Sequence, residues 1–498
     1  MNKHKIILSL AALALLVSGC NESQKKSNKA SDDLSEVIKT SLVYLEMSNS
    51  GYEQYQPWKQ TSITKEAGYG CAVGPYEVLT TAENVMNATL IQATCYGQNE
   101  FVPATVKVLD YEYNLCILKL DETALKTPLV PVSFKEKYPG GQNITTCWLS
   151  SGSHLTTARS TIDRAEMRYS DISFVKSLYY LATNTSRPFG DGEVCFYGHD
   201  AIGMAAWGVD SDSGIIPSEI VNKFLSKVKE ETYVGFGQVG FRIFPLLDPT
   251  MRKFLKMPPE IDYGAYVSTV YSLGTGSEEL KPADVILSID GYSLNPYGRY
   301  QHPQYDRISF ENLILQKSAG DTLSFEIWRD GAKETIEVAA KNFDASQMLV
   351  PYYEYGKQPE YVVLGGFVFQ NLTRNFLAMW GEDWSGKVPP HLYHYYSDLS
   401  FDPTPEREKV VVLNYVLPTE SNLGYQGLSR LVVSTVNGKD VKSIKDILDA
   451  AGSSDNSEFL VIEFEMNSPT VVINKSQLPM ESMRVAQMYG IPVLNNVE

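Results

Sequence analysis

Two carboxylates in the N-terminal half of the chain lie in runs that could place them at a reactive site. Glu83 lies in residues 79–85, directly after β-prone residues, and Asp191 lies in the turn-forming residues 188–193. If the fold brings these side chains face to face, they could share one proton as an acid–base pair or bind a cation. Carboxylates that are solvated or paired with Arg or Lys are far commoner, and the sequence leaves both interpretations open.

Other reactive residues form no complete site. Residues 210–214 begin like a calcium loop but lack the later bidentate glutamate, so an exposed turn explains them better. His391 and His394 have helical spacing among tyrosines, where aromatic packing is commoner than zinc binding. The sequence has no Cys-x-x-Cys pair and no glycine-rich phosphate loop, so we predict neither a metal nor an organic cofactor.

Charge and composition exclude some classes of function. The chain has 498 residues and a formal net charge of -16. Proteins that bind nucleic acid or anionic lipid through their surface need basic faces, so we expect no nucleic-acid partner. The length and the apolar content of 43% suit two to four domains with packed cores.

The N-terminus has the pattern of a secretory signal. Lys3 and Lys5 precede an apolar run at residues 6–17 that is too short to cross a bilayer comfortably. The run ends in Val17-Ser18-Gly19-Cys20, which fits the bacterial lipobox. We therefore predict a lipoprotein signal peptide at residues 1–19 and a lipidated Cys20; an ordinary signal or an uncleaved anchor is the alternative.

The residues after Cys20 bear on location. The polar residues 20–33 predict a flexible tether. Asn21, in place of aspartate, does not indicate retention at the inner membrane. We expect a chain anchored by lipid in the bacterial cell envelope, at the outer membrane and facing the periplasm.

Residues 34–231 alternate short β-rich runs with turns, which favours a double barrel over a parallel sheet. A helix with one apolar face, expected at residues 217–230, closes this domain. The expected strands are residues 42–46, 71–73, 78–80, 89–96, 104–109, 115–120, 145–149, 172–175, 194–197 and 201–206.

Residues 232–343 resemble a PDZ domain. A glycine-bracketed turn at 235–240 runs into an alternating strand, and PDZ domains use such a turn to present N–H groups to the C-terminal carboxylate of a peptide. The strand edge that follows pairs with the peptide. The residues expected to bind peptide are Phe236, Gly237, Val239, Gly240, Phe241 and Ile243.

Residues 344–498 partly repeat that pattern. Residues 431–441 echo residues 284–294, and a helix at 444–450 with strands at 458–465 and 470–474 follows. An insert at residues 383–407, rich in Tyr and Pro, is expected to form a surface loop.

Residues 79–85, Leu-Thr-Thr-Ala-Glu-Asn-Val, resemble the Leu-Thr-Asn-Ala-His-Val of the Do/HtrA (Deg) family of trypsin-like serine proteases. The resemblance places Glu83 at the family's catalytic histidine and Asn114 at its aspartate. The family's nucleophile falls on Gly190 without an alignment gap, or on Asp191 with one. Since a hydroxyl nucleophile needs an imidazole to take its proton, the resemblance implies a degenerate triad and no catalytic residues.

The plant-type members of the family, which carry a specialised second PDZ domain, are the most similar. The residues that carry this resemblance are 56–58, 316–317, 320–321, 350–351, 359–361, 365–369 and 490–492. It implies a mainly β fold, a trypsin-like double β-barrel followed by two PDZ-type α+β domains. In such relatives the second PDZ serves packing and assembly, and a homo-trimer or hexamer is expected.

The sequence therefore favours a pseudoprotease that binds polypeptide C-termini or unfolded segments and acts as scaffold, adaptor or chaperone. One alternative is an active serine endopeptidase in protein quality control with an unrecognised nucleophile, for which Ser186 is the nearest serine. The other is a purely structural component of the envelope.

Overall fold

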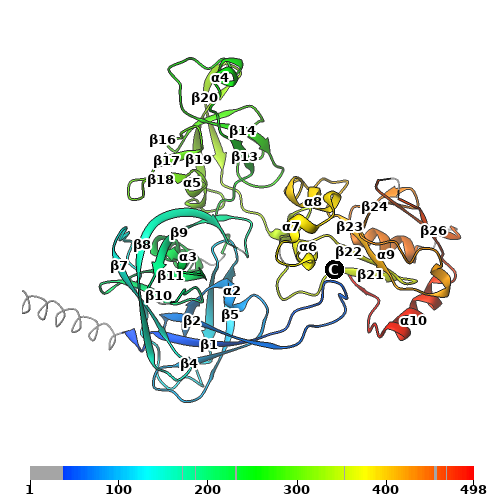
Figure 1. The fold of residues 1–498 in the computed structure, drawn as a ribbon, viewed down its shortest axis with the longest axis horizontal. Helices are drawn as coiled ribbons and strands as arrows, with labels where there is room; N and C mark the ends of the chain where they lie inside the picture. Colours follow the sequence, from blue (N-terminus) through cyan, green and yellow to red (C-terminus); the bar gives the residue numbers. More distant parts are fainter. Residues whose placement is uncertain are drawn as a thin grey trace, which may run out of the picture.

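The computed structural model describes residues 38–497 except 171, 186, 230–232, 353, 454–456 and 467. The predictions for the signal peptide, for Cys20 and its tether, and for Ser186 lie outside these residues. Among the described helices, none combines the length and the apolarity needed to cross a bilayer. Figure 1 shows the barrels, a middle unit (residues 233–343) above them and a last unit (residues 344–497) beside them.

The N-terminal barrel closes in the order β1-β2-β3-β6-β5-β4. The β2–β3 hairpin places Cys71 opposite Leu79, and the short helix α2 (Ala82–Val85) follows at once. The side chain of Thr81 caps α2 by accepting from the Asn84 N–H (3.4 Å). The strands are β1 (Leu42–Asn49), β2 (Thr64–Gly74), β3 (Glu77–Thr80), β4 (Ala88–Cys95), β5 (Val102–Asp110) and β6 (Leu115–Leu120).

The C-terminal barrel closes in the order β10-β11-β12-β9-β8-β7. Helix α3 (Ser218–Val228) follows it and buries Ile220, Val221 and Phe224 on one face. The strands are β7 (Asn143–Leu149), β8 (Leu155–Tyr169), β9 (Lys176–Asn184), β10 (Val194–Tyr197), β11 (Asp200–Val209) and β12 (Asp212–Pro217). The strand expected at 172–175 is wrong, because these residues form the connection between β8 and β9.

The middle unit is a sheet in the order β13-β14-β15-β19-β20, with β13 at one edge. Helix α5 (Glu311–Leu315) lies near that edge, and α4 (Pro249–Phe254) lies at the far end of the unit (Figure 1). The strands are β13 (Phe241–Phe244), β14 (Ala265–Val270), β15 (Val285–Ile289), β16 (Tyr292–Ser293), β17 (Arg299–Gln301), β18 (Arg307–Ser309), β19 (Thr322–Arg329) and β20 (Ala332–Ala339).

The last unit is a second sheet, in the order β27-β26-β24-β23-β22-β21-β28. The insert expected to be a surface loop instead folds into α7 (Trp384–Lys387) and α8 (Pro390–Ser397), because its aromatic residues bury Leu392 and Tyr395. The strands are β21 (Tyr361–Leu364), β22 (Phe367–Asn371), β23 (Val411–Val416), β24 (Leu431–Val436), β25 (Lys439–Asp440), β26 (Phe459–Phe464), β27 (Val471–Asn474) and β28 (Asn495–Asn496), and the helices are η1 (Ala345–Gln347), α6 (Arg374–Leu377), η2 (Ala378–Trp380), η3 (Glu420–Asn422), α9 (Ile444–Gly452) and α10 (Leu478–Tyr489).

The three units are joined by specific contacts. Buried Tyr113 of the N-terminal barrel donates its hydroxyl to the Leu315 carbonyl of α5 (2.6 Å). The segment between β1 and β2 reaches the last unit, where Gln370 donates to the Gln54 carbonyl (3.0 Å). The mainly β class and the order of barrel pair and sheet units agree with the sequence prediction.

Candidate functional site

The backbone of Glu83 lies beside the side chain of Asn114. Glu83 is in α2, and its backbone N–H donates to Oδ1 of Asn114 (2.9 Å). Asn114 is 1% exposed and has a φ of 55°, a left-handed conformation that asparagine tolerates better than most residues. The carboxamide is thus fixed at the helix start, but neither residue offers an imidazole.

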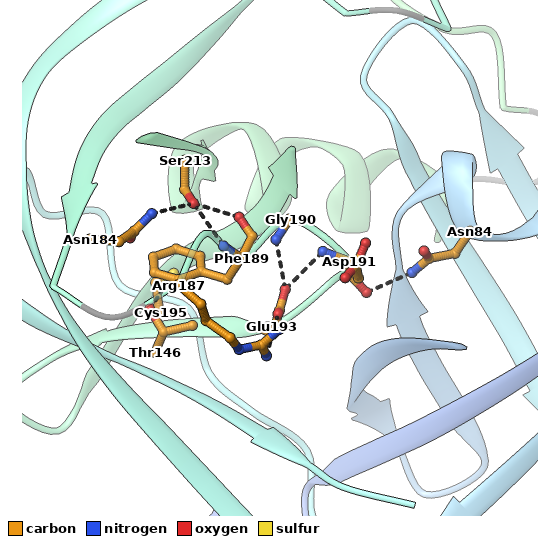
Figure 2. Close-up of polar contacts among 10 residues, drawn as sticks. All are labelled: Asn84, Thr146, Asn184, Arg187, Phe189, Gly190, Asp191, Glu193, Cys195 and Ser213. Atoms are coloured by element: carbon orange, nitrogen blue, oxygen red, sulfur yellow. Dashed lines mark hydrogen bonds and ion pairs between the residues drawn. The ribbon is translucent and has the colours of Figure 1, made fainter. Parts of the chain in front are cut away.

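The loop before β10 folds around the carboxylate of Glu193 (Figure 2). The backbone N–H groups of Gly190 and Asp191 both donate to Glu193 Oε2, at 3.0 and 2.8 Å. Arg187 approaches the other carboxylate oxygen at 3.5 Å and stacks over the Trp148 ring. The N–H groups of this loop therefore bind a carboxylate that belongs to the loop itself, that of Glu193.

Burial dominates the electrostatics of Glu193, whose side chain is 0% exposed. Burial, together with the charge of Asp191, raises the pKa of Glu193 to about 7; hydrogen bonds from the backbone of Glu193 and Asp191 and the charge of Arg187 act in the opposite direction. Burial raises the pKa of Asp191; the charge of Glu66 acts in the same direction and that of Arg187 in the opposite one. The acid–base pair of Glu83 and Asp191 stays a prediction.

The same loop bridges the two barrels. The Asp191 carbonyl accepts from the Tyr69 N–H (2.7 Å) and from Asn84 Nδ2 (2.8 Å). At Gly192, with a φ of 96°, a Cβ would lie 2.2 Å from the Tyr69 carbonyl oxygen. Only glycine fits here, so the approach of the barrels fixes the loop.

A serine does not fit at Gly190 in this conformation. A Cβ there would lie 2.3 Å from the carbonyl carbon of Trp207, and the Trp207 ring itself lies against Gly214. Ser213, the hydroxyl in this loop environment, is fully buried, donates to the Phe189 carbonyl (2.6 Å) and accepts from the Phe189 N–H (3.0 Å). Ser213 thus has a structural role.

Strand β13 and helix α5 border an apolar groove of about 230 Å³. Of the predicted peptide-binding residues, Val239, Phe241 and Ile243 line it. Phe236 does not; it is 3% exposed and packs against Tyr113, so it belongs to the contact with the barrel.

The loop before β13 does not present its N–H groups as expected. Gly237, Gln238 and Gly240 donate theirs to the carbonyls of Lys317, Lys341 and Thr275, at 2.8–2.9 Å. These bonds close the loop onto its own unit. These three N–H groups could bind a peptide carboxylate only if their present hydrogen bonds broke.

Sequence reasoning missed Gln238, which also lines the groove. Gln238 is 3% exposed, its Oε1 accepts from the Phe343 N–H (3.2 Å), and its Nε2 has no partner among the described residues. A buried amide donor without a partner is costly and suits a peptide carbonyl or carboxylate. No sequence pattern marks this residue, because its role depends on its burial.

The other units complete the walls of the groove. Lys176 of β9 pairs with Glu311 of α5 (2.8 Å), and Phe401 of the last unit packs near Tyr271. Arg242 of β13 donates to the Ser397 carbonyl of α8 (3.2 Å). A ligand in the groove would therefore contact all three units.

The remaining sequence candidates have structural partners. His391 Nε2 lies 3.0 Å from the Arg430 carbonyl, and His394 Nδ1 lies 2.7 Å from Asp398. Within the described residues no cluster of three His, Cys, Asp or Glu side chains could hold a metal. The exposed turn predicted at residues 210–214 is only partly correct: Asp210, with a φ of 53°, and Ser211 are exposed, but Ser213 and Gly214 are buried in β12.

A family model described as a PDZ domain (PDZ_3) matches residues 350–495. Putative protease Do-like 3, mitochondrial, from Arabidopsis thaliana is 24% identical over 457 residues, which span 86% of this chain and 78% of the relative. Protease Do-like 2, chloroplastic, from the same plant is 25% identical over 444 residues, spanning 88% and 71%.

Among solved structures, the HtrA-type protease AlgW with a decapeptide superposes with a TM-score of 0.46 at 15% identity, covering 62% of this chain and 98% of AlgW. The sequence relatives extend over the barrels and both sheet units. The chain is a homologue of the Do/HtrA family of serine proteases, the family of the plant Deg proteases, and carries a PDZ domain.

Proposed function

We propose that this protein is a pseudoprotease of the bacterial cell envelope that binds extended polypeptide segments through the groove beside β13 and acts as a scaffold, adaptor or chaperone. The barrel pair serves as a support for the groove. The assignment as a pseudoprotease rests on one observation: the N–H groups of Gly190 and Asp191 both donate to the carboxylate of Glu193.

That observation does not depend on the alignment. A serine protease stabilises its oxyanion with the N–H of the nucleophile residue and the N–H two residues earlier. If the nucleophile position is Gly190, the second donor would be Pro188, which has no N–H. If it is Asp191, the second donor is Phe189, whose N–H donates to Ser213. Under both assignments the oxyanion has no free pair of donors.

The names of the relatives favour a second candidate, an active serine endopeptidase, with Ser186 as the nearest serine. A fluorophosphonate probe, which labels activated serines, separates the two. We expect no labelling of the full chain, because Glu83 cannot replace an imidazole as general base. Labelling that disappears in Ser186→Ala and persists in Ser213→Ala would establish the protease.

The groove beside β13 supports the proposal that the protein binds extended polypeptide segments. Strand β13 is an edge strand, so its outer N–H and C=O groups can pair with an added peptide strand, and apolar side chains provide pockets. Since three N–H groups of the preceding loop are already paired, we propose that the groove takes internal segments as readily as C-termini.

Peptide titration tests this with variants on opposite faces of β13. Ile243 lines the groove, whereas Phe244 is 65% exposed and does not line it. Ile243→Asp should abolish binding of apolar peptides to the full chain, and Phe244→Asp should not. Free acids and C-terminal amides should bind with equal affinity; strong preference for the acid would instead indicate carboxylate capture.

Anchoring and assembly complete the proposal. We propose a lipidated Cys20 at the outer membrane and a homo-trimer or hexamer, in which weak single sites gain from multivalency. Intact mass of the mature chain tests the lipid, and light scattering tests the assembly. An unmodified Cys20, a monomer and no peptide binding together would favour the purely structural alternative.

A further inference from the structure

A cavity of about 600 Å³, whose lining includes charged, amide and tyrosine side chains, lies between helix α3 and the middle unit, apart from the groove beside β13. Helix α3 contributes Glu219 and Lys223, α5 contributes Asn312, and Tyr292 and Tyr300 come from β16 and β17. The barrel connection contributes Glu136. Neither the barrel site nor the peptide groove uses this cavity.

Two buried acceptors at this cavity have no hydrogen-bond donor. Asn312 is 1% exposed and donates through Nδ2 to the Tyr300 hydroxyl (2.9 Å), but its Oδ1 has no partner among the described residues. Oε1 of Glu219 is buried and unpaired within the same part of the chain. Native proteins rarely leave buried acceptors unpaired, so a group that brings N–H donors would stabilise the site.

Glu219 lies close to the Tyr300–Asn312 pair. Burial raises the pKa of Tyr300 to about 12, and the charge of Glu219 contributes to the rise. Burial is the main reason that the pKa of Glu219 is raised, and the charge of Glu136 adds to the rise; the Tyr305 hydroxyl and the charge of Lys223 act in the opposite direction. One side of the cavity therefore concentrates acceptors and negative charge.

The cations near the cavity have other partners. Lys317 pairs with Asp290 at 2.7 Å, and Lys223 donates to the Leu315 carbonyl (3.1 Å) and to Gln316 Oε1 (3.4 Å). Over the described residues, neither Glu136 nor Glu219 forms an ion pair within 4.0 Å. The charge of Lys223 still lowers the pKa of Glu219, so without an ion pair this side of the cavity is only partly neutralised.

The aromatic lining also suits a cation. The rings of Tyr292 and Tyr300 lie 5.2 Å apart, and His302 lies beside Tyr300. His302 Nδ1 accepts from the backbone N–H groups of Gln304 and Tyr305, and burial lowers the pKa of His302, so the imidazole is neutral. Aromatic faces attract ammonium groups within about 6 Å.

We propose that this cavity is a binding site for a primary ammonium group on an aliphatic chain, held by the Glu219 carboxylate and the Asn312 carbonyl oxygen, with the exposed Tyr292 ring beside the chain. The same chemistry occurs in a free diamine and in the side chain of lysine. The ligand would bridge α3 and the middle unit and so strengthen the contact between them.

Calorimetric titration of the full chain with putrescine tests this proposal, and its diol analogue, which has the same length but no charge, is the control ligand. We expect saturable binding of putrescine, weakened by added salt, and none of the diol. A blocked lysine, acetylated at its α-amine and amidated at its carboxyl group, distinguishes the sources: binding by it indicates a polypeptide lysine, and binding by putrescine alone indicates a free amine.

Variants locate the site. Glu219→Gln should weaken binding about tenfold, because it removes a charge-assisted hydrogen bond. Glu136→Gln, at an exposed position that does not threaten folding, should weaken it less, and Glu166→Gln on β8 is a matched control that should not. Absence of saturable binding by either amine, or binding unchanged in both Glu219→Gln and Glu136→Gln, would overturn the proposal.

Discussion

Glu193 is a buried carboxylate held by two backbone N–H groups of its own loop and by the half-exposed Arg187. The donors favour the ionised form, whereas burial favours the neutral form and is the larger effect. The pKa of about 7 means that the folded protein holds a proton that unfolded glutamate would already have lost near pH 4.5.

Stability should therefore fall as the pH rises from about 4.5 to about 7. Below this window both states are protonated, and above it both are ionised; within it the unfolded state binds fewer protons, so the free energy of unfolding decreases by up to ~3 kcal/mol. Denaturant unfolding across this window measures the slope. Glu193→Gln should flatten it, and an identical slope in that variant would show that other carboxyls are responsible.

At the scale of elements, strand β9 and helix α5 connect the C-terminal barrel to the middle unit. Lys176 begins β9 and Glu311 begins α5, where the helix dipole also favours a carboxylate. Their ion pair has side-chain exposures of only 32% and 14%. Removing one partner would leave a largely buried charge.

Lys176→Met should destabilise the protein by ~1–3 kcal/mol, because Glu311 would then be buried without its cation. The matched control is Lys333→Met, which breaks an ion pair with Glu326 whose side chains are 46% and 40% exposed. That variant should cost less than ~1 kcal/mol. Urea unfolding of both variants measures the difference, and equal losses would contradict the role of burial.

Much of the fold could be predicted because its strands carry their own signals. Residues 115–120 and 194–197 were predicted and form β6 and β10 with the same limits. The false strand at 172–175 contains apolar side chains, but Ser170 and Ser173 accept from the nearby N–H groups of Ile172 and Val175 and hold a turn. At residues 172–175, hydrogen bonds from nearby N–H groups to serine hydroxyls favour a turn over the strand that the apolar composition predicts.

The candidate site was only partly predictable. The structure brings the backbone of Glu83 and the side chain of Asn114 together, but their assignment to the family's triad positions stays a prediction. The roles of Glu193 and Gln238 depend on burial and on which backbone groups point toward them. Neither property is visible in a single sequence.

At the scale of the whole molecule, the segment between β1 and β2 links the barrels to the last unit (Figure 1). Tyr55 stacks on Tyr415 at 4.7 Å between ring centroids, and Trp58 packs near Tyr361 at 5.8 Å. Gln370, which is 1% exposed, donates to this segment. The last unit is therefore held by contacts distant from its own chain connection.

Trp58→Ala should loosen the last unit while the barrels stay folded, because it removes ~1–3 kcal/mol of apolar packing at this contact. Small-angle X-ray scattering should show a larger radius of gyration. Trp380→Ala is the control, since Trp380 lies in η2 within the last unit and packs with Phe376 and Arg430. An unchanged radius in Trp58→Ala would mean that other contacts are sufficient.

The structure of the loop around Glu193 also affects how easily substitutions could produce a protease triad in this chain. A serine restored at Gly190 meets the backbone of Trp207, and a shortened side chain at position 193 leaves two N–H groups unpaired. On the proposed triad assignment, a histidine at position 83 would have the carboxamide of Asn114 beside it instead of a carboxylate that orients it. Each single substitution toward a triad therefore lowers stability or adds no catalytic activity. On the function proposed above, the loss of the protease site is difficult to reverse one substitution at a time.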